Sequence, residues 1–242
     1  MFGDSFRPEP RTGVLLRRYG QDAAAWDVAV VMPEGPAPDR GFPLLVVLDG
    51  ALHFDAAVAA ARALARRPGK TEVGPMIVLG IASGRDWSHD AERRERALLP
   101  GAADNAALHA VLRLALDEVA AMAPVDPVRR AVMGHSFGGL FALDALVRAP
   151  GLFGTCIALS PSLWNAPGLA ENVAAALAGR DARILLASGE QEPQINADLP
   201  AAAAILAEVV RVERTVLPGE DHGSIPFAAL PMALRFVHGV IR

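Results

Sequence analysis

A serine between two glycines stands where the surrounding sequence favours nucleophilic chemistry. The segment Gly134-His135-Ser136-Phe137-Gly138 follows the apolar run Val128–Met133 and precedes a stretch of helical periodicity. This context is typical of a nucleophile elbow, a tight strand-to-helix turn that exposes a serine hydroxyl. We expect a Cβ at Gly134 or Gly138 to collide with the neighbouring strand or helix. The alternative is an ordinary turn whose serine caps the helix.

A serine nucleophile needs a base, and the positions of the histidines narrow the choice. In sites of this kind the histidine follows the serine along the chain. Of six histidines, His222 and His238 follow the elbow by the needed distance. His238 lies in an apolar helical stretch, where a surface or packing role is expected. His222 lies in the loop Pro218–Ser224 directly after a predicted strand, so we predict His222 as the general base.

The carboxylate that orients this histidine is expected after the preceding strand, Arg183–Ala187. Glu190 and Glu192 both follow that strand, and Asp198 is a more distant candidate. Glu190 comes so close to the strand end that its side chain is expected to point away from the histidine loop. Pro193 restricts the backbone of Glu192 to extended geometry and stiffens it. We therefore predict Glu192 as the acid, with Glu190 as the alternative.

Acyl transfer also requires backbone donors for an oxyanion. One is predicted to be the amide of Phe137, the residue after the serine. The second is predicted to be the amide of Ala51, in the loop Asp49–Leu52 after a buried strand, where Gly50 permits close backbone approach. The alternative for this loop is a common Asp-Gly turn.

Strand-like and helix-like segments alternate along the chain and would position these residues. Strands are predicted at Thr12–Tyr19, Trp26–Met32, Leu44–Leu48, Met76–Ile81, Val128–Met133, Phe153–Leu159, Arg183–Ala187 and Arg211–Leu217. Helices are predicted at Phe54–Arg67, from an Asp104 N-cap to Met122, after the elbow, and at Leu169–Ala178, Leu199–Val210 and Phe227–Val240. The first two strands are expected to pair antiparallel. The pattern predicts an α/β fold in one domain, residues 1–242, with a mostly parallel sheet of about eight strands and helices on both faces.

Composition excludes several classes of function. The chain has 242 residues and a net charge of −4, with acidic and basic residues interleaved, so a nucleic-acid partner is not expected. Hydrophobic residues make up 52% of it, yet no stretch of transmembrane length lacks polar residues, and its first residues lack the features of a secretory signal. No metal or cofactor is implied, because no cluster of ligand residues has suitable spacing. The single cysteine, Cys156, is expected to be buried, and a cytoplasmic location is predicted.

An irregular insertion at about residues 83–101 is predicted to overhang the active site. Arginines and acidic residues crowd around Trp87 there. Arg94, Arg96, Trp87 and the more distant Trp164 are predicted substrate-binding residues, suited to an anionic or aromatic ester. The alternative is that these arginines pair with neighbouring carboxylates on a solvated helix.

These motifs together resemble the putative esterase family of α/β-hydrolases, which includes siderophore esterases, S-formylglutathione hydrolases and mycolyltransferases. The resemblance covers nearly the whole chain. Its carriers are Val47-Leu48-Asp49-Gly50, Gly134 to Leu143, Ser160-Pro161-Ser162-Leu163-Trp164 and Glu220-Asp221-His222-Gly223-Ser224. It implies the α/β-hydrolase fold, Ser136 as nucleophile, His222 as its histidine, and the amides of Phe137 and Ala51 as the oxyanion hole.

The run Ser160 to Trp164 is similar to the siderophore-esterase branch in particular, with two departures. Ala97 stands where those esterases carry an aspartate, and Asn165 replaces the second member of a tryptophan pair. Both positions are expected to face substrate. The predicted function is a serine ester hydrolase acting on a small carboxylic ester, with esters of siderophore or aromatic type as the candidate substrates. The alternatives are an acyltransferase with the same serine and a non-catalytic binding protein on a hydrolase scaffold; the oligomeric state is left open.

Overall fold

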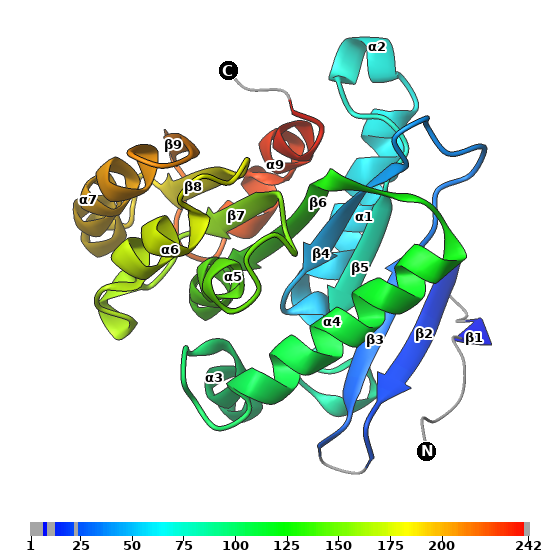
Figure 1. The fold of residues 1–242 in the computed structure, drawn as a ribbon, viewed down its shortest axis with the longest axis horizontal. Helices are drawn as coiled ribbons and strands as arrows, with labels where there is room; N and C mark the ends of the chain where they lie inside the picture. The colour runs from blue at the N-terminus through cyan, green and yellow to red at the C-terminus, as the bar shows by residue number, and fades with distance from the viewer. Residues whose placement is uncertain (1–6, 9–12, 22–23, 240–242) are drawn as a thin grey trace.

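The computed structural model describes residues 7–8, 13–21 and 24–239 and is built around one nine-stranded sheet (Figure 1). The strands are β1 (Arg7–Pro8), β2 (Val14–Tyr19), β3 (Trp26–Val31), β4 (Phe42–Val47), β5 (Ile77–Ile81), β6 (Val125–His135), β7 (Thr155–Leu159), β8 (Arg183–Gly189) and β9 (Arg211–Leu217). Their order in the sheet is β1-β2-β3-β5-β4-β6-β7-β8-β9. Eight of these strands correspond to predicted ones, and the two-residue β1 is additional.

The sheet is antiparallel at its N-terminal edge and parallel from β5 to β9. β1, β2, β3 and β5 pair antiparallel in that order, which confirms the predicted pairing of the first two long strands. All remaining pairs are parallel. β4, β5 and β7 are buried at every residue, as expected for parallel strands covered on both faces.

Helices cover both faces of the sheet (Figure 1). They are α1 (Gly50–Ala65), α2 (Pro68–Thr71), α3 (Ala91–Leu98), α4 (Asn105–Met122), α5 (Phe137–Arg148), α6 (Leu169–Leu177), α7 (Pro193–Ala207), α8 (Ile225–Ala228) and α9 (Leu230–Val237), with 3-10 turns η2 (Arg85–Trp87) and η3 (Leu163–Asn165). One core packs α1, α8 and α9 against the sheet, and the other packs α3 to α7 against its opposite face. Alternate residues of β4 enter the two cores: Leu44 and Val46 one, Leu45 and Val47 the other. None of the helices in the described part of the chain is both long enough and apolar enough to span a bilayer.

The chain reverses its direction of travel across the sheet at β4. β5 is added on one side of β4, and β6 is then added on the other side. Ligands of open α/β sheets bind at the carboxyl ends of strands next to such a switch point. The carboxyl ends of β4 and β6 carry the two segments that the sequence singles out, Asp49–Leu52 and the serine turn.

Three predicted helices have different bounds in the structure. The first begins at Gly50 rather than Phe54, because the carbonyl of Asp49 already accepts the amides of Leu52 and His53. α7 begins at Pro193 rather than Leu199, with Pro193 in its first turn and Pro200 inside it. The closing helix is broken into α8 and α9, with a proline at the start of the second. Thr12 and Val240, the ends of two predicted elements, lie outside the described residues.

Candidate active site

Ser136 occupies a strained turn between β6 and α5. Its backbone has φ 59° and ψ −117°, a conformation that non-glycine residues rarely adopt, and its amide donates to the carbonyl of Leu159 at 2.9 Å. A Cβ at Gly134 would overlap the backbone carbonyl of Gly138. At Gly138 it would lie 3.3 Å from Asp49 Oδ2, so the predicted collision is correct at Gly134 and wrong at Gly138. The Ser136 side chain forms no capping hydrogen bond with α5, which excludes the simple cap.

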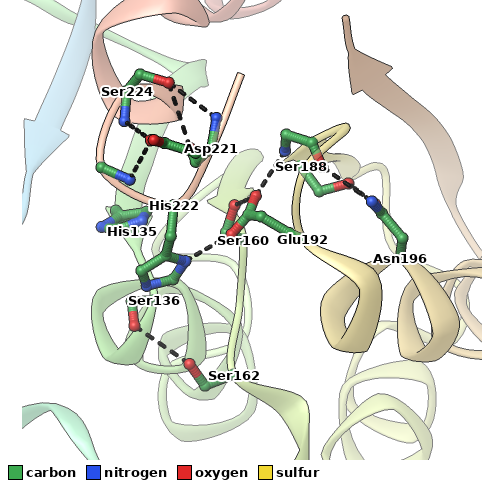
Figure 2. Close-up of polar contacts among 12 residues, drawn as sticks. His135, Ser136, Ser160, Ser162, Ser188, Glu192, Asn196, Asp221, His222 and Ser224 are labelled. Carbon is green, nitrogen blue, oxygen red and sulfur yellow. Dashed lines mark hydrogen bonds and ion pairs between the residues drawn. The ribbon is translucent and has the colours of Figure 1, made fainter. Parts of the chain in front are cut away.

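Glu192 and His222 meet beside this turn (Figure 2). Nδ1 of His222 lies 2.5 Å from Glu192 Oε1. Figure 2 shows the His222 ring between the Glu192 carboxylate and Ser136. The imidazole is 48% exposed, whereas the Glu192 side chain is 3% exposed. The structure thus brings the predicted nucleophile, base and acid together from three loops that follow β6, β9 and β8.

The Glu192 carboxylate is held by further donors. Its Oε2 accepts hydrogen bonds from Ser160 Oγ and from the Gly189 amide, both at 2.6 Å. Glu190 instead accepts the Gly219 amide at 2.8 Å, which holds the turn after β9. Asp198 pairs with Gln194 on α7. Of the three candidate acids, Glu192 is the one in contact with His222.

The Ser136 hydroxyl has a partner that the sequence did not suggest. Its Oγ lies 3.2 Å from the Oγ of Ser162, which is buried in the segment after β7. Within the described residues, the Ser136 hydroxyl forms this hydrogen bond with Ser162 and forms none with His222. Ser160 and Ser162 are therefore both placed at the site. The signal available in the sequence was their position at the end of the strand that follows the elbow.

The predicted oxyanion donors lie in the first turns of two helices. Ala51 is the second residue of α1 and Phe137 the first residue of α5. Amides of a first helical turn lack acceptors within the helix and point toward an approaching anion. The sequence-based expectation of a loop at residues 49–52 is corrected, because only Asp49 lies outside the helix. Asp49 has φ 53° and ψ 46°, in the left-handed region.

The predicted substrate rim is arranged differently from expectation. Nε of Arg94 donates to Asp49 Oδ1 at 2.8 Å, and its Nη2 donates to the His135 carbonyl at 3.1 Å. The Arg94 side chain is thus directed into the protein rather than onto a rim. Arg96 is exposed and pairs with Asp104 at 2.9 Å. The arginines do pair with carboxylates, although the partners of Arg94 and Arg96 lie outside the insertion.

The two tryptophans differ in exposure. Trp87 is half-buried and packs edge-on against Phe54, with ring centroids 5.4 Å apart. Trp164 is 49% exposed in η3, two residues beyond Ser162. Ala97 is fully buried in the core under α3, so the expectation that this position faces substrate is wrong. Of these three positions, Trp164 is the one open to a ligand.

Two further histidines line the site on the side of α1. The ring of His135 lies 4.4 Å from that of His222, and the ring of His53 lies 6.1 Å from that of His135. Burial, together with the nearby His222, lowers the pKa of His135 to about 3. Burial also lowers the pKa of His53. Both are therefore neutral near pH 7, and a lowered pKa makes an imidazole a poor acceptor for the proton that a general base must take up. His238, the other candidate base, donates from Nδ1 to the Leu234 carbonyl at the end of α9.

Fold and site together define an α/β-hydrolase with a serine at the nucleophile elbow. The family model described as Putative esterase matches residues 24–222. The chain is 27% identical over 258 residues to the ferri-bacillibactin esterase BesA of Bacillus subtilis, covering 94% of this chain and 89% of that protein. This chain therefore belongs to the putative esterase family and is a carboxylic ester hydrolase.

Solved structures show the same fold at lower sequence identity. The BES protein from Bacillus cereus superimposes with a TM-score of 0.83 at 20% identity, covering 98% of this chain and 99% of that one. The siderophore hydrolase EstA from Aspergillus nidulans gives a TM-score of 0.79 at 20% identity, covering 97% and 98%. At these identities the likeness concerns the architecture.

Proposed function

We propose that the chain hydrolyses a siderophore-type or aromatic carboxylic ester through an acyl-enzyme on Ser136. The observation that carries this proposal is the contact of His222 Nδ1 with the carboxylate of Glu192. This carboxylate is buried and accepts three hydrogen bonds. A carboxylate in this position holds the imidazole in the tautomer with Nε2 free to take a proton, and it stabilises the imidazolium that forms.

The acylation step follows from these positions. Rotation about the Cα–Cβ bond of Ser136 exchanges its Ser162 partner for His222. Oγ then attacks the ester carbonyl carbon while its proton passes to Nε2 of His222. The amides of Ala51 and Phe137 donate to the resulting oxyanion. Collapse of the tetrahedral intermediate breaks the bond to the alcohol oxygen, which leaves with the proton held by His222.

Deacylation repeats the sequence with water as the nucleophile. His222 removes a proton from water, the hydroxide attacks the acyl carbon, and Ser136 leaves with the proton returned by His222. The half-exposed imidazole gives water direct access to this base. An alcohol reaches an exposed base equally well, so we favour hydrolysis over transfer because the relatives are named as esterases. The cytoplasmic location that the sequence predicts belongs to the same proposal.

The substrate part of the proposal rests on exposed apolar side chains around the site. Leu52 follows Ala51 and is 47% exposed, Trp164 is 49% exposed, and Phe227, whose ring lies 5.5 Å from that of His53, is 48% exposed. Large exposed apolar groups beside a nucleophile suit a substrate with flat or apolar parts. The siderophore type is suggested by the names of similar proteins, which include a siderophore triacetylfusarinine C esterase of Aspergillus fumigatus and the siderophore hydrolase EstA of Aspergillus nidulans.

Replacement of the nucleophile tests the proposal. Ser136→Ala should lower ester turnover on the order of 10³-fold or more and abolish labelling by a fluorophosphonate, while circular dichroism stays unchanged. The assay compares a catecholate trilactone, a short nitrophenyl ester and a long aliphatic ester, each with and without a competing alcohol. Activity within tenfold of the wild type would exclude the serine mechanism, and new ester formed from the alcohol would identify a transferase.

A further inference from the structure

Arg94 of α3 joins the two segments that supply the proposed oxyanion donors. Its Nε donates to the side chain of Asp49, and its Nη2 donates to the main-chain carbonyl of His135. Asp49 immediately precedes the helix turn that contains Ala51. His135 immediately precedes Ser136 and Phe137. A single guanidinium therefore fixes the segment after β4 relative to the segment after β6.

Each of the two segments contains a strained residue at or beside its contact with Arg94. Asp49 and Ser136 have φ values of 53° and 59°, and such conformations persist only where the surroundings hold them. Arg94 bonds directly to the side chain of Asp49. It also bonds to the carbonyl of the peptide that enters Ser136, while the amide of that peptide donates to Leu159 at 2.9 Å. The peptide before the nucleophile is thus held at both ends.

Two other contacts show how closely the segments approach each other. The guanidinium carbon of Arg94 lies 5.5 Å from the centre of the ring of Phe137, a cation–π contact with a residue whose amide is a proposed oxyanion donor. Asp49 Oδ2 lies close to Gly138 of α5: a Cβ added at Gly138 would be 3.3 Å from it. The Arg94–Asp49 pair therefore lies against the first turn of α5 as well as the first turn of α1.

The ion pair is shielded from solvent. The side chains of Arg94 and Asp49 are 16% and 1% exposed, whereas those of Arg96 and Asp104, farther along the same helix and in the next loop, are 52% and 26% exposed. An exposed pair contributes little, but removal of one partner from a buried pair leaves an uncompensated charge. The position of Arg94 is therefore strongly determined.

We propose that Arg94 is a positioning residue for the oxyanion hole, which keeps the amides of Ala51 and Phe137 at the separation that the tetrahedral intermediate requires. It acts through these two segments and does not touch the substrate. This inference rests on the proposed function, because an oxyanion hole has a purpose only in acyl transfer. It replaces the sequence-based assignment of Arg94 to substrate binding.

The two roles make different kinetic predictions. A residue that binds an anionic substrate changes KM, and does so for charged esters alone. A residue that aligns oxyanion donors changes the stability of the transition state, so kcat falls for charged and neutral esters alike.

The experiment measures kcat and KM of the wild type, Arg94→Ala and Arg94→Lys on a neutral and an anionic ester of the same alcohol. We expect Arg94→Ala to lower kcat on the order of 10²-fold on both esters, because small misplacements of catalytic donors cost about that much. Arg94→Lys should recover part of the loss, since an ammonium keeps the charge beside Asp49 but lacks the fork that also reaches His135.

A second measurement follows the oxyanion itself. An aryl boronic acid forms an anionic tetrahedral adduct with the serine, so its affinity should fall in parallel with kcat, while the affinity for the carboxylic acid product is unchanged. Arg129→Ala is the matched control. It removes an arginine from fully buried Asp126 (3.1 Å) on β6, away from the site, and should lower stability without lowering kcat.

Should Arg94→Ala fail to fold, the double variant Asp49→Asn/Arg94→Gln removes both buried charges and replaces it in the same assays. The inference is overturned if a folded variant keeps kcat within about threefold and keeps its boronate affinity, or if the loss appears only in KM for the anionic ester. A wild-type protein that hydrolyses no ester and binds no boronate would instead remove the proposed function, and this inference with it.

Discussion

Glu192 differs from Glu190 in what its carboxylate contacts, and this difference predicts their separate effects on catalysis. Glu192 reaches His222, whereas Glu190 accepts the Gly219 amide. Glu192→Gln should lower kcat by up to ~10⁴-fold, because an amide can stabilise the wrong imidazole tautomer and cannot balance the imidazolium. The measurement is kcat for both glutamine variants on one ester, above the pH at which activity levels off.

Glu190→Gln serves as the control for Glu192→Gln and should stay within about threefold of the wild type, as expected for an exposed carboxylate. A larger loss in Glu190→Gln would reverse the assignment. Small losses in both variants would mean that Ser136 and His222 act as a dyad.

At this scale the sequence predicted the residues whose chemistry is tied to chain order. The strand–turn–helix context, the histidine after the last strand and the acid stiffened by Pro193 lead to Ser136, His222 and Glu192, which the structure brings together. Arg94 and Ser162 could not be placed in the same way. Their contacts with Asp49 and Ser136 join residues 45 and 26 positions apart, and an arginine or serine forms such contacts without a local pattern.

Among the elements, strands were predicted more closely than helix ends. Continuous apolar runs such as β4 and β5 identify buried strands directly. Helix starts depend on local backbone geometry: Pro193 was interpreted as stiffening the loop that carries Glu192, whereas in the structure it occupies the first turn of α7. The start of α1 was missed because Asp49 initiates it from a left-handed conformation that no residue pattern announces.

Substitution of the two glycines in the elbow between β6 and α5 should have very different effects on stability. Gly134→Ala places a methyl group against the backbone carbonyl of Gly138, which cannot move without displacing α5, so a loss of ~1–3 kcal/mol in the free energy of unfolding is expected. Gly138→Ala meets a carboxylate oxygen at 3.3 Å and should cost less than ~1 kcal/mol. Urea unfolding followed by circular dichroism measures both.

Gly69→Ala is the reference for this comparison, because the Cβ position of Gly69 has open space around it and its φ is not positive. If Gly134→Ala were no less stable than Gly69→Ala, the close approach of β6 and α5 would not constrain this position.

For the whole molecule, the alternation of elements predicts a parallel sheet but not the order of its strands. That order is decided by packing between distant segments, such as β6 on the far side of β4 from β5. It creates the switch point at which Arg94, Asp49 and the serine turn meet. The candidate site thus depends on contacts between residues that lie far apart in the sequence, which no local pattern predicts.

Buried histidines should make the whole molecule sensitive to acid. Burial lowers the pKa of His53, His135 and His238, to about 3 for His135, whereas an unfolded histidine titrates near 6.5. Between these values the unfolded chain binds more protons, so the stabilisation is complete above about pH 6.5 and is lost as the pH falls toward 3. We expect the thermal midpoint to fall between pH 7.5 and pH 5, and to fall less in His135→Gln. Ser136→Ala, a neighbouring change without an ionisable group, should follow the wild type; equal slopes in all three proteins would show that His135 is not the group responsible.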